Sequence, residues 1–246
     1  MELVLFLGFA AFFTSAITAS MGVGGGVVLL GLMAQLVPPA LLIPLHGAAQ
    51  LMSNTSRVLV QRQHIHWAYI RPFTVGAVIG GAALTPLVLW VPTWLGQVLL
   101  GLFILVATWR SQWLKLQQWH AWASGAVTTG LSLVLGATGP LVMSVLPKAK
   151  WSREVVVGTH GMAMVIQHGI KLIAFSSLSF SVLDHWPLLL TMAVATLAGN
   201  LTGARMLGRI PEQFFTKALD VLLSLLALRL IYQGVDAYSR SILTLS

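Results

Sequence analysis

Two groups of polar side chains interrupt long apolar stretches of this sequence, and their types are those that bind anions. Within each group the residues recur at spacings of three and four, which places them on one side of a helix. The first polar face comprises His46, Gln50, Ser53, Asn54 and Arg57, and the second comprises His160, Met164, Gln167, His168 and Lys171. Imidazole, amide, hydroxyl and cationic groups donate hydrogen bonds to oxyanions. Neither face contains an acid to hold a cation, so both predict an anion site.

A glycine-rich break precedes each polar face. The first reads Gly22-Val-Gly-Gly-Gly26 and the second Gly136-Ala-Thr-Gly-Pro140. Glycine and proline interrupt helices, and a broken backbone persists in a bilayer only where protein or a water-filled cavity satisfies it. A helix that begins there presents N–H groups and its positive dipole end to an anion. We therefore predict that the breaks contribute Gly22, Gly24, Gly25, Gly26, Gly136, Thr138 and Gly139 to substrate binding.

Each of these features also has a purely structural interpretation. The glycines could permit close helix packing, and His46 and His160 could be satisfied core residues. Arg57 and Lys171 could extend along the membrane to reach its surface. The spacing of the residues leaves both interpretations open.

The elements that carry these residues are predicted to be membrane-spanning helices. The chain is 57% apolar and only 8% charged, against roughly 25% charged in soluble domains. Positions 3–56 and 72–109 contain no charged residue, and spans of about 20 residues fit these stretches. Despite a formal charge of +8, the basic residues stand singly between apolar runs. The lipid bilayer is therefore the expected surrounding, and nucleic acid is not an expected partner. The absence of cysteine excludes disulfides and thiolate metal sites.

Charge in the connections predicts the topology. The basic linkers are 61–71, 110–120, 148–153 and 205–211, whereas 37–39, 91–93 and 178–185 contain no Lys or Arg. The positive-inside rule places the basic linkers in the cytoplasm. Because 121–147 lies between two basic linkers and carries a helix break, it is predicted to enter the membrane and return to the same side.

The chain also matches itself. Gly22, Gly25 and His46-Gly47 align with Gly136, Gly139 and His160-Gly161; after a short insertion Trp67, Gly80 and Pro92 align with Trp186, Gly199 and Pro211. The connection after the first break is uncharged and that after the second is basic, so the halves face opposite ways. The predicted fold is an all-α polytopic membrane protein of two inverted repeats, 1–109 and 121–246, joined by a cytoplasmic linker at 110–120. Each repeat is a re-entrant broken hairpin plus three transmembrane helices.

The sequence resembles the sulfite exporter TauE/SafE family over almost its whole length. The resemblance is carried by the Gly22–Gly26 motif, a proline-bounded helix ending in Arg57, the aromatic linker His66-Trp67 and the glycine-rich helix from Gly76 to Gly81. It implies a multi-pass protein of the bacterial inner membrane that exports sulfite, sulfonates or related organosulfur anions. Because the second break departs from the first motif, the resemblance does not specify the anion.

Together these features predict a secondary transporter that exports a small sulfur-containing anion by alternating access, with one half rocking against the other around a site near the midplane. A channel-like anion pathway and an intramembrane enzyme or scaffold subunit are the alternatives. The sequence contains no His-Glu-x-x-His motif and no supported nucleophile–base pair. No enzyme activity, catalytic residue, metal ligand or cofactor is therefore expected. The expected partners are a small anion, the bilayer and, as an open possibility, further copies of the chain.

Overall fold

The computed structural model describes residues 2–21, 24–110, 113, 119–147, 150–181, 183–206 and 212–243. These residues form helices and their connections, which confirms the all-α prediction. The first five helices are α1 (Glu2–Met21), α2 (Gly25–Met33), α3 (Pro39–Gln61), α4 (Trp67–Val88) and α5 (Thr93–Trp109). The next five are α6 (Ala121–Leu135), α7 (Gly139–Val145), α8 (Arg153–Ser177), α9 (Trp186–Met206) and α10 (Glu212–Leu243).

Four stretches of the described residues are long and apolar enough to cross a membrane. They are Glu2–Ala19 in α1, Trp67–Val88 in α4, Leu183–Gly203, which begins just before α9, and Asp220–Ser241 in α10. The shorter helices α5 and α6 are also apolar. Large apolar side chains such as Phe9, Ile79 and Leu225 are exposed on these helices, as a lipid-facing surface requires. The prediction of a membrane protein with several apolar helices is therefore confirmed.

Helices begin or end at both predicted breaks. Gly24, which precedes α2, has a φ of 110°, and Gly136, which follows α6, has a φ of 78°. Residues with a Cβ atom rarely adopt these backbone dihedral angles. The chain thus enters α2 and leaves α6 through a glycine.

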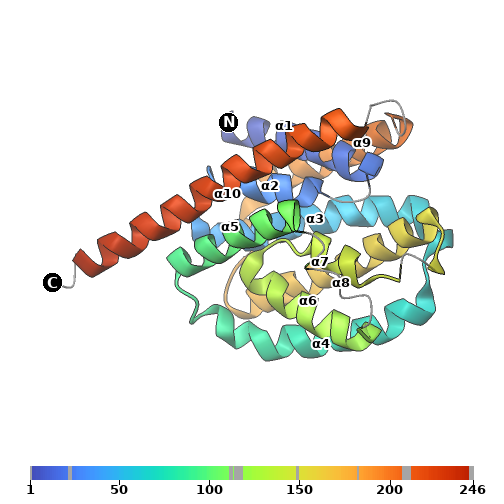
Figure 1. The fold of residues 1–246 in the computed structure, drawn as a ribbon, viewed down its shortest axis with the longest axis horizontal. Helices are drawn as coiled ribbons and strands as arrows, with labels where there is room; N and C mark the ends of the chain where they lie inside the picture. Colours follow the sequence, from blue (N-terminus) through green and yellow to red (C-terminus); the bar gives the residue numbers. More distant parts are fainter. Residues whose placement is uncertain are drawn as a thin grey trace.

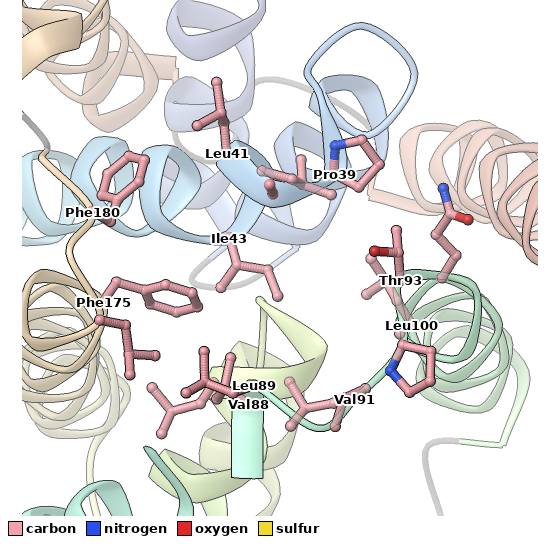
Figure 2. Close-up of a pocket in the computed structure, with 18 of the residues that line it drawn as sticks. Pro39, Leu41, Ile43, Val88, Leu89, Val91, Thr93, Leu100, Phe175 and Phe180 are labelled. Carbon is pink, nitrogen blue, oxygen red and sulfur yellow. The ribbon is translucent and has the colours of Figure 1, made fainter. Parts of the chain in front are cut away.

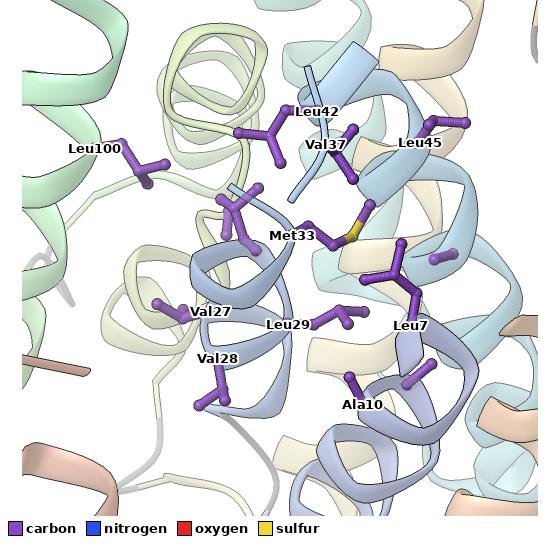
Figure 3. Packing of buried hydrophobic residues seen from close by; sticks show 14 of the residues in the cluster. Leu7, Ala10, Val27, Val28, Leu29, Met33, Val37, Leu42, Leu45 and Leu100 are labelled. Carbon is purple, nitrogen blue, oxygen red and sulfur yellow. The ribbon is translucent and has the colours of Figure 1, made fainter. Parts of the chain in front are cut away.

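The polar helices α3 and α8 lie between the other elements. In Figure 1, α4 and α6 lie along one edge of the molecule and α1 and α9 along the opposite edge, with α3 and α8 between them. A fully buried apolar cluster packs α2 against its neighbours, with Leu7 of α1, Leu29 and Met33 of α2, and Leu45 of α3 (Figure 3). A second cluster, which includes Phe73 of α4, packs α4 against α7 and α8.

In two helix pairs, each with one helix from either half of the chain, the helix backbones meet at a glycine. A Cβ atom on Gly80 of α4 would lie 2.0 Å from the carbonyl oxygen of Ala126 in α6. A Cβ atom on Gly199 of α9 would lie 2.2 Å from the carbonyl oxygen of Phe12 in α1. Only residues without a side chain allow such backbone contact. These contacts involve positions that the repeat alignment matches, so the pairs α4–α6 and α1–α9 correspond to each other.

Helices that correspond to each other run antiparallel where they touch. Gly47 of α3 lies beside Lys171 of α8, whereas Gly161, early in α8, lies beside Val58, late in α3. In the same way Gly101 and Gly234 place the start of α5 beside the end of α10. The contacts of α3 with α8 and of α5 with α10 are thus both antiparallel.

Candidate functional site: a buried cavity between the helix breaks

A small cavity lies where the two breaks and the two polar faces meet. It has a volume of about 30 Å³. Its lining residues are Thr18, Gly24, Gly26, Val27, His46, Gln50, Asn54, Arg57, Ala137, Gly139, Pro140, His160, Met164 and His168. Among the described residues no Asp or Glu lines it, and none of them form a His, Asp and Glu group suited to a metal ion. The donors present suit an anion.

His46 and His160 connect the central helices to the short helices. The Nε2 atom of His46 lies 2.8 Å from the carbonyl oxygen of Gly26, and that of His160 lies 3.1 Å from the carbonyl oxygen of Gly139. Because a carbonyl oxygen only accepts, each Nε2 carries the proton and donates it. The two histidines occupy matching positions of the repeat, and each fixes the start of a short helix against the cavity.

Arg57 is held inside the protein and does not extend to the membrane surface. Its side chain is buried and lines the cavity, and it donates a hydrogen bond to the side-chain oxygen of Asn54. Asn54 in turn donates from Nδ2 to the backbone oxygen of Gln50 at 2.7 Å. This chain of contacts orients the guanidinium group beside the cavity.

His168 is the buried side chain whose environment most clearly calls for a ligand. It is 1% exposed, it lines the cavity, and neither ring nitrogen has a hydrogen-bond partner. Its ring lies edge-on to that of His46, with 6.0 Å between the ring centres. A buried polar group without a partner costs roughly 1–3 kcal/mol. A bound oxyanion would offer the imidazole an acceptor.

Lys171 lies next to the cavity but does not line it. The side chain is 0% exposed, and Nζ donates to the carbonyl oxygen of Gly136 at 2.5 Å. Gly136 caps the end of α6, so the ammonium group lies at the negative end of that helix. Lys171 is therefore buried rather than extended to the membrane surface, and it stabilises the second break.

Ser53 and Gln167 hold the central helices against the first helix of their own half. The hydroxyl groups of Ser53 and Ser15 of α1 lie 3.0 Å apart. Gln167 donates from Nε2 to the hydroxyl of Thr128 in α6 at 2.6 Å and accepts from Thr138 at 3.0 Å. Ser53, Thr138 and Gln167 are thus placed outside the cavity lining, although Ser53 and Gln167 belong to the predicted polar faces.

The remaining predicted glycines belong to the breaks. A Cβ atom on Gly25 would lie 1.8 Å from the carbonyl oxygen of Thr14, so Gly25 allows α2 to pack against α1. Gly136 is outside the cavity lining as well. Gly22 lies outside the described residues, as do Lys148 and Arg209 of two linkers that were predicted to be cytoplasmic.

Several residues at the site were missed by the sequence analysis. Thr18, Ala137 and Pro140 line the cavity. Asn200 of α9 donates from Nδ2 to the backbone oxygen of Ser53 at 2.8 Å and to the hydroxyl of Ser56 at 2.6 Å. A single amide in the middle of an apolar span is a signal that could have identified Asn200, because such groups rarely face lipid.

A second, larger cavity opens near one end of the central helices. It has a volume of about 490 Å³ and is lined mainly by apolar side chains from the start of α3, the α4–α5 connection, and the ends of α6 and α8. Figure 2 shows Ile43, Val88 and Phe175 around this space. Ile43 also lies 3.5 Å from where a Cβ atom of Gly136 would be. An apolar layer that includes Ile43 therefore lies between this cavity and the second break. On the predicted topology this cavity faces the outside, and we call it the outer cavity.

Comparison with known proteins shows the family to which the chain belongs. Neither the curated proteins nor the solved structures yielded a match to the chain. The model of the family described as sulfite exporter TauE/SafE matches residues 7–230, a range that contains both breaks, both central helices and every residue that lines the buried cavity. The chain therefore belongs to the sulfite exporter TauE/SafE family.

Proposed function

We propose that the protein is a secondary transporter that exports a small sulfur-containing anion through the buried cavity. Its family is one of membrane transporters of sulfur anions. The observation that carries the proposal is the cavity itself, which brings Arg57 and the unpartnered imidazole of His168 together between two helix breaks. The bacterial inner membrane is the location that this function and the basic linkers support.

The donors around the cavity provide the binding chemistry. Arg57 supplies charge-assisted hydrogen bonds, which are about twice as strong as neutral ones, and His168 supplies an imidazole nitrogen. Helix α2 begins at Gly25 with Gly24 and Gly26 at the cavity wall. The first N–H groups of a helix have no acceptor within it, so they add positive potential there. Because the described residues of the lining include no acid, a cation is disfavoured.

The antiparallel pairing of α3 and α8 supports an inverted repeat. The glycine contacts between other helices support a division of the helices into two groups that each move as one body. Because α1 is packed on α9 and α4 on α6, each half is tied to the other by backbone contact. This tie supports moving bodies other than the two halves. We propose that one body contains α1, α2, α3 and α9, which contact one another, and that the other contains α4, α6, α7 and α8. They meet along α3 and α8, where the buried cavity lies.

The apolar layer outside the buried cavity supports an alternating mechanism. A channel would need a continuous opening, whereas an apolar layer lies between the outer cavity and the second break.

The test is anion flux into proteoliposomes that contain the purified protein. Sulfite, sulfate, thiosulfate and short sulfonates are compared, with protein-free liposomes as the control. We expect saturable flux of at least one sulfur anion, stimulated by the same anion on the opposite side. Flux that rises linearly with concentration would favour a channel, and flux equal to that of protein-free liposomes would refute the proposed function.

A further inference from the structure

We propose that Gly47 and Gly161 are positioning residues that determine where Lys171 and Arg57 lie at the crossing of α3 and α8. The inference rests on the proposed function only in that the two cations attract the transported anion. Both glycines follow the histidines that hold the helix breaks, and they occupy matching positions of the repeat. In each half the His-Gly pair thus has two tasks: the histidine fixes its own break, and the glycine admits the cation of the other half.

Gly47 makes room for the stem of Lys171. A Cβ atom on Gly47 would lie 3.0 Å from Cδ and 3.6 Å from Cγ of Lys171. The first distance is shorter than an ordinary carbon–carbon contact of about 3.5–4.0 Å. The stem is fully buried and its Nζ is held by the carbonyl oxygen of Gly136. An alanine at position 47 would therefore require the lysine stem to shift by a few tenths of an ångström, which disturbs the contact of Nζ with the break.

Gly161 has the corresponding relation to Arg57, with more space. A Cβ atom on Gly161 would lie 3.6 Å from Nε of Arg57 and 3.2 Å from Cγ2 of Val58. The guanidinium group of Arg57 lines the buried cavity and is bound to Asn54. The Arg57 contact is of ordinary length, so a methyl group at position 161 is expected to shift Arg57 less than one at position 47 shifts Lys171.

Gly47 and Gly161 both lie inside long helices, where glycine is less favourable than alanine. Helix stability therefore does not explain why glycine occupies these positions. Gly169 lies on α8 as well, and a Cβ atom there would have nothing within 4 Å. Gly169→Ala is therefore the matched control, because it changes helix propensity without meeting a neighbour.

The experiment compares Gly47→Ala, Gly161→Ala and Gly169→Ala by concentration-dependent flux and by thermal unfolding of the purified protein. We expect Gly47→Ala to raise the KM for the anion severalfold, and by no more than Lys171→Ala raises it, and Gly161→Ala to raise it less. Gly169→Ala should keep the wild-type KM. If Gly47→Ala and Gly169→Ala have the same KM while the wild type transports, the positioning role is refuted and the proposed function stands.

A double-mutant cycle with Lys171→Ala separates positioning from general packing. In the wild type, Gly47→Ala should lower the unfolding temperature, because the added methyl group meets the lysine stem. In the Lys171→Ala background the stem is gone, so the same substitution should be neutral or stabilising, and it should add nothing to the KM. The unfolding measurement needs no substrate, so it decides the matter even if no tested anion is transported. Equal unfolding shifts in both backgrounds would overturn the inference.

Discussion

Among the residues at the buried cavity, His168 combines near-complete burial with two unsatisfied ring nitrogens. A structural histidine in a core would be hydrogen-bonded, as buried polar groups usually are. A buried polar side chain without a hydrogen-bond partner lowers the stability of the folded protein. A ligand that forms the missing hydrogen bond restores that stability. We therefore interpret His168 as a group that contacts the anion.

This interpretation predicts opposite effects of His168→Leu on stability and on binding. Removing the unpartnered imidazole should leave the unfolding temperature unchanged or raise it, because no hydrogen bond is lost. The affinity for the anion should fall about tenfold, the equivalent of one hydrogen bond to a charged group. Thermal unfolding with and without the anion, together with KM, measures both effects. A lower unfolding temperature with unchanged KM would identify a structural histidine instead.

The two cations should contribute unequally to binding. Arg57 lines the cavity and Lys171 does not. The Nζ atom of Lys171 instead donates a hydrogen bond to the carbonyl oxygen of Gly136. Arg57→Gln should weaken anion binding by roughly 1.5–3 kcal/mol, which is about ten- to a hundredfold, and Lys171→Gln should weaken it less. Binding titrations on normally expressed variants provide the comparison. A larger loss for Lys171→Gln would show that the lysine leaves Gly136 and contacts the anion directly.

At the scale of the elements, the structure depends on backbone contact between helices rather than on large interlocking side chains. Gly80→Ala should separate α4 from α6, because the added Cβ would lie 2.0 Å from the backbone oxygen of Ala126, which cannot turn away as a side chain can. Overpacking of this kind costs about 1–3 kcal/mol or more. A clear fall in unfolding temperature is expected. Gly96→Ala on α5 is the control, because a Cβ atom there meets nothing within 4 Å, and an equal fall in both variants would contradict the packing argument.

At the scale of the whole molecule, the proposed moving bodies predict which cross-links stop transport. The chain has no cysteine, so pairs can be introduced without removing native thiols. Gly8→Cys with Thr191→Cys joins α1 to α9 within one body, since a Cβ atom on Gly8 would lie 2.7 Å from Cγ2 of Thr191. Val58→Cys with Gly161→Cys joins α3 to α8 between the bodies. Oxidation should preserve flux in the first pair and abolish it in the second, and reduction should restore it.

Each reduced double-cysteine protein serves as the control for its oxidised form. If oxidation abolishes flux in both pairs, the result favours the two halves of the sequence as the moving bodies, because each pair joins one half to the other. The division of the helices proposed above would then be wrong.

The sequence alone determined the class of the protein and the chemistry of its centre. Low charge and long apolar runs require a membrane protein, because so few polar groups cannot cover a soluble fold. Gly24 and Gly136 mark the helix breaks because their dihedral angles are unfavourable for other residues. The helical period placed Arg57 and His168 on polar faces that cannot face lipid.

Tertiary structure decided which of these polar residues meet the cavity and which hold the helices together. The helical period shows that Ser53 lies on the same face as Asn54, but not that a neighbouring helix reaches the edge of that face. Ser53 and Gln167 contact α1 and α6, while Asn54 and His168 line the cavity. The pairing of α1 with α9 was equally invisible, because it depends on glycine contacts between residues far apart in the chain. Local sequence fixes the direction of a side chain on its own helix, and only the packing of distant segments fixes what that side chain meets.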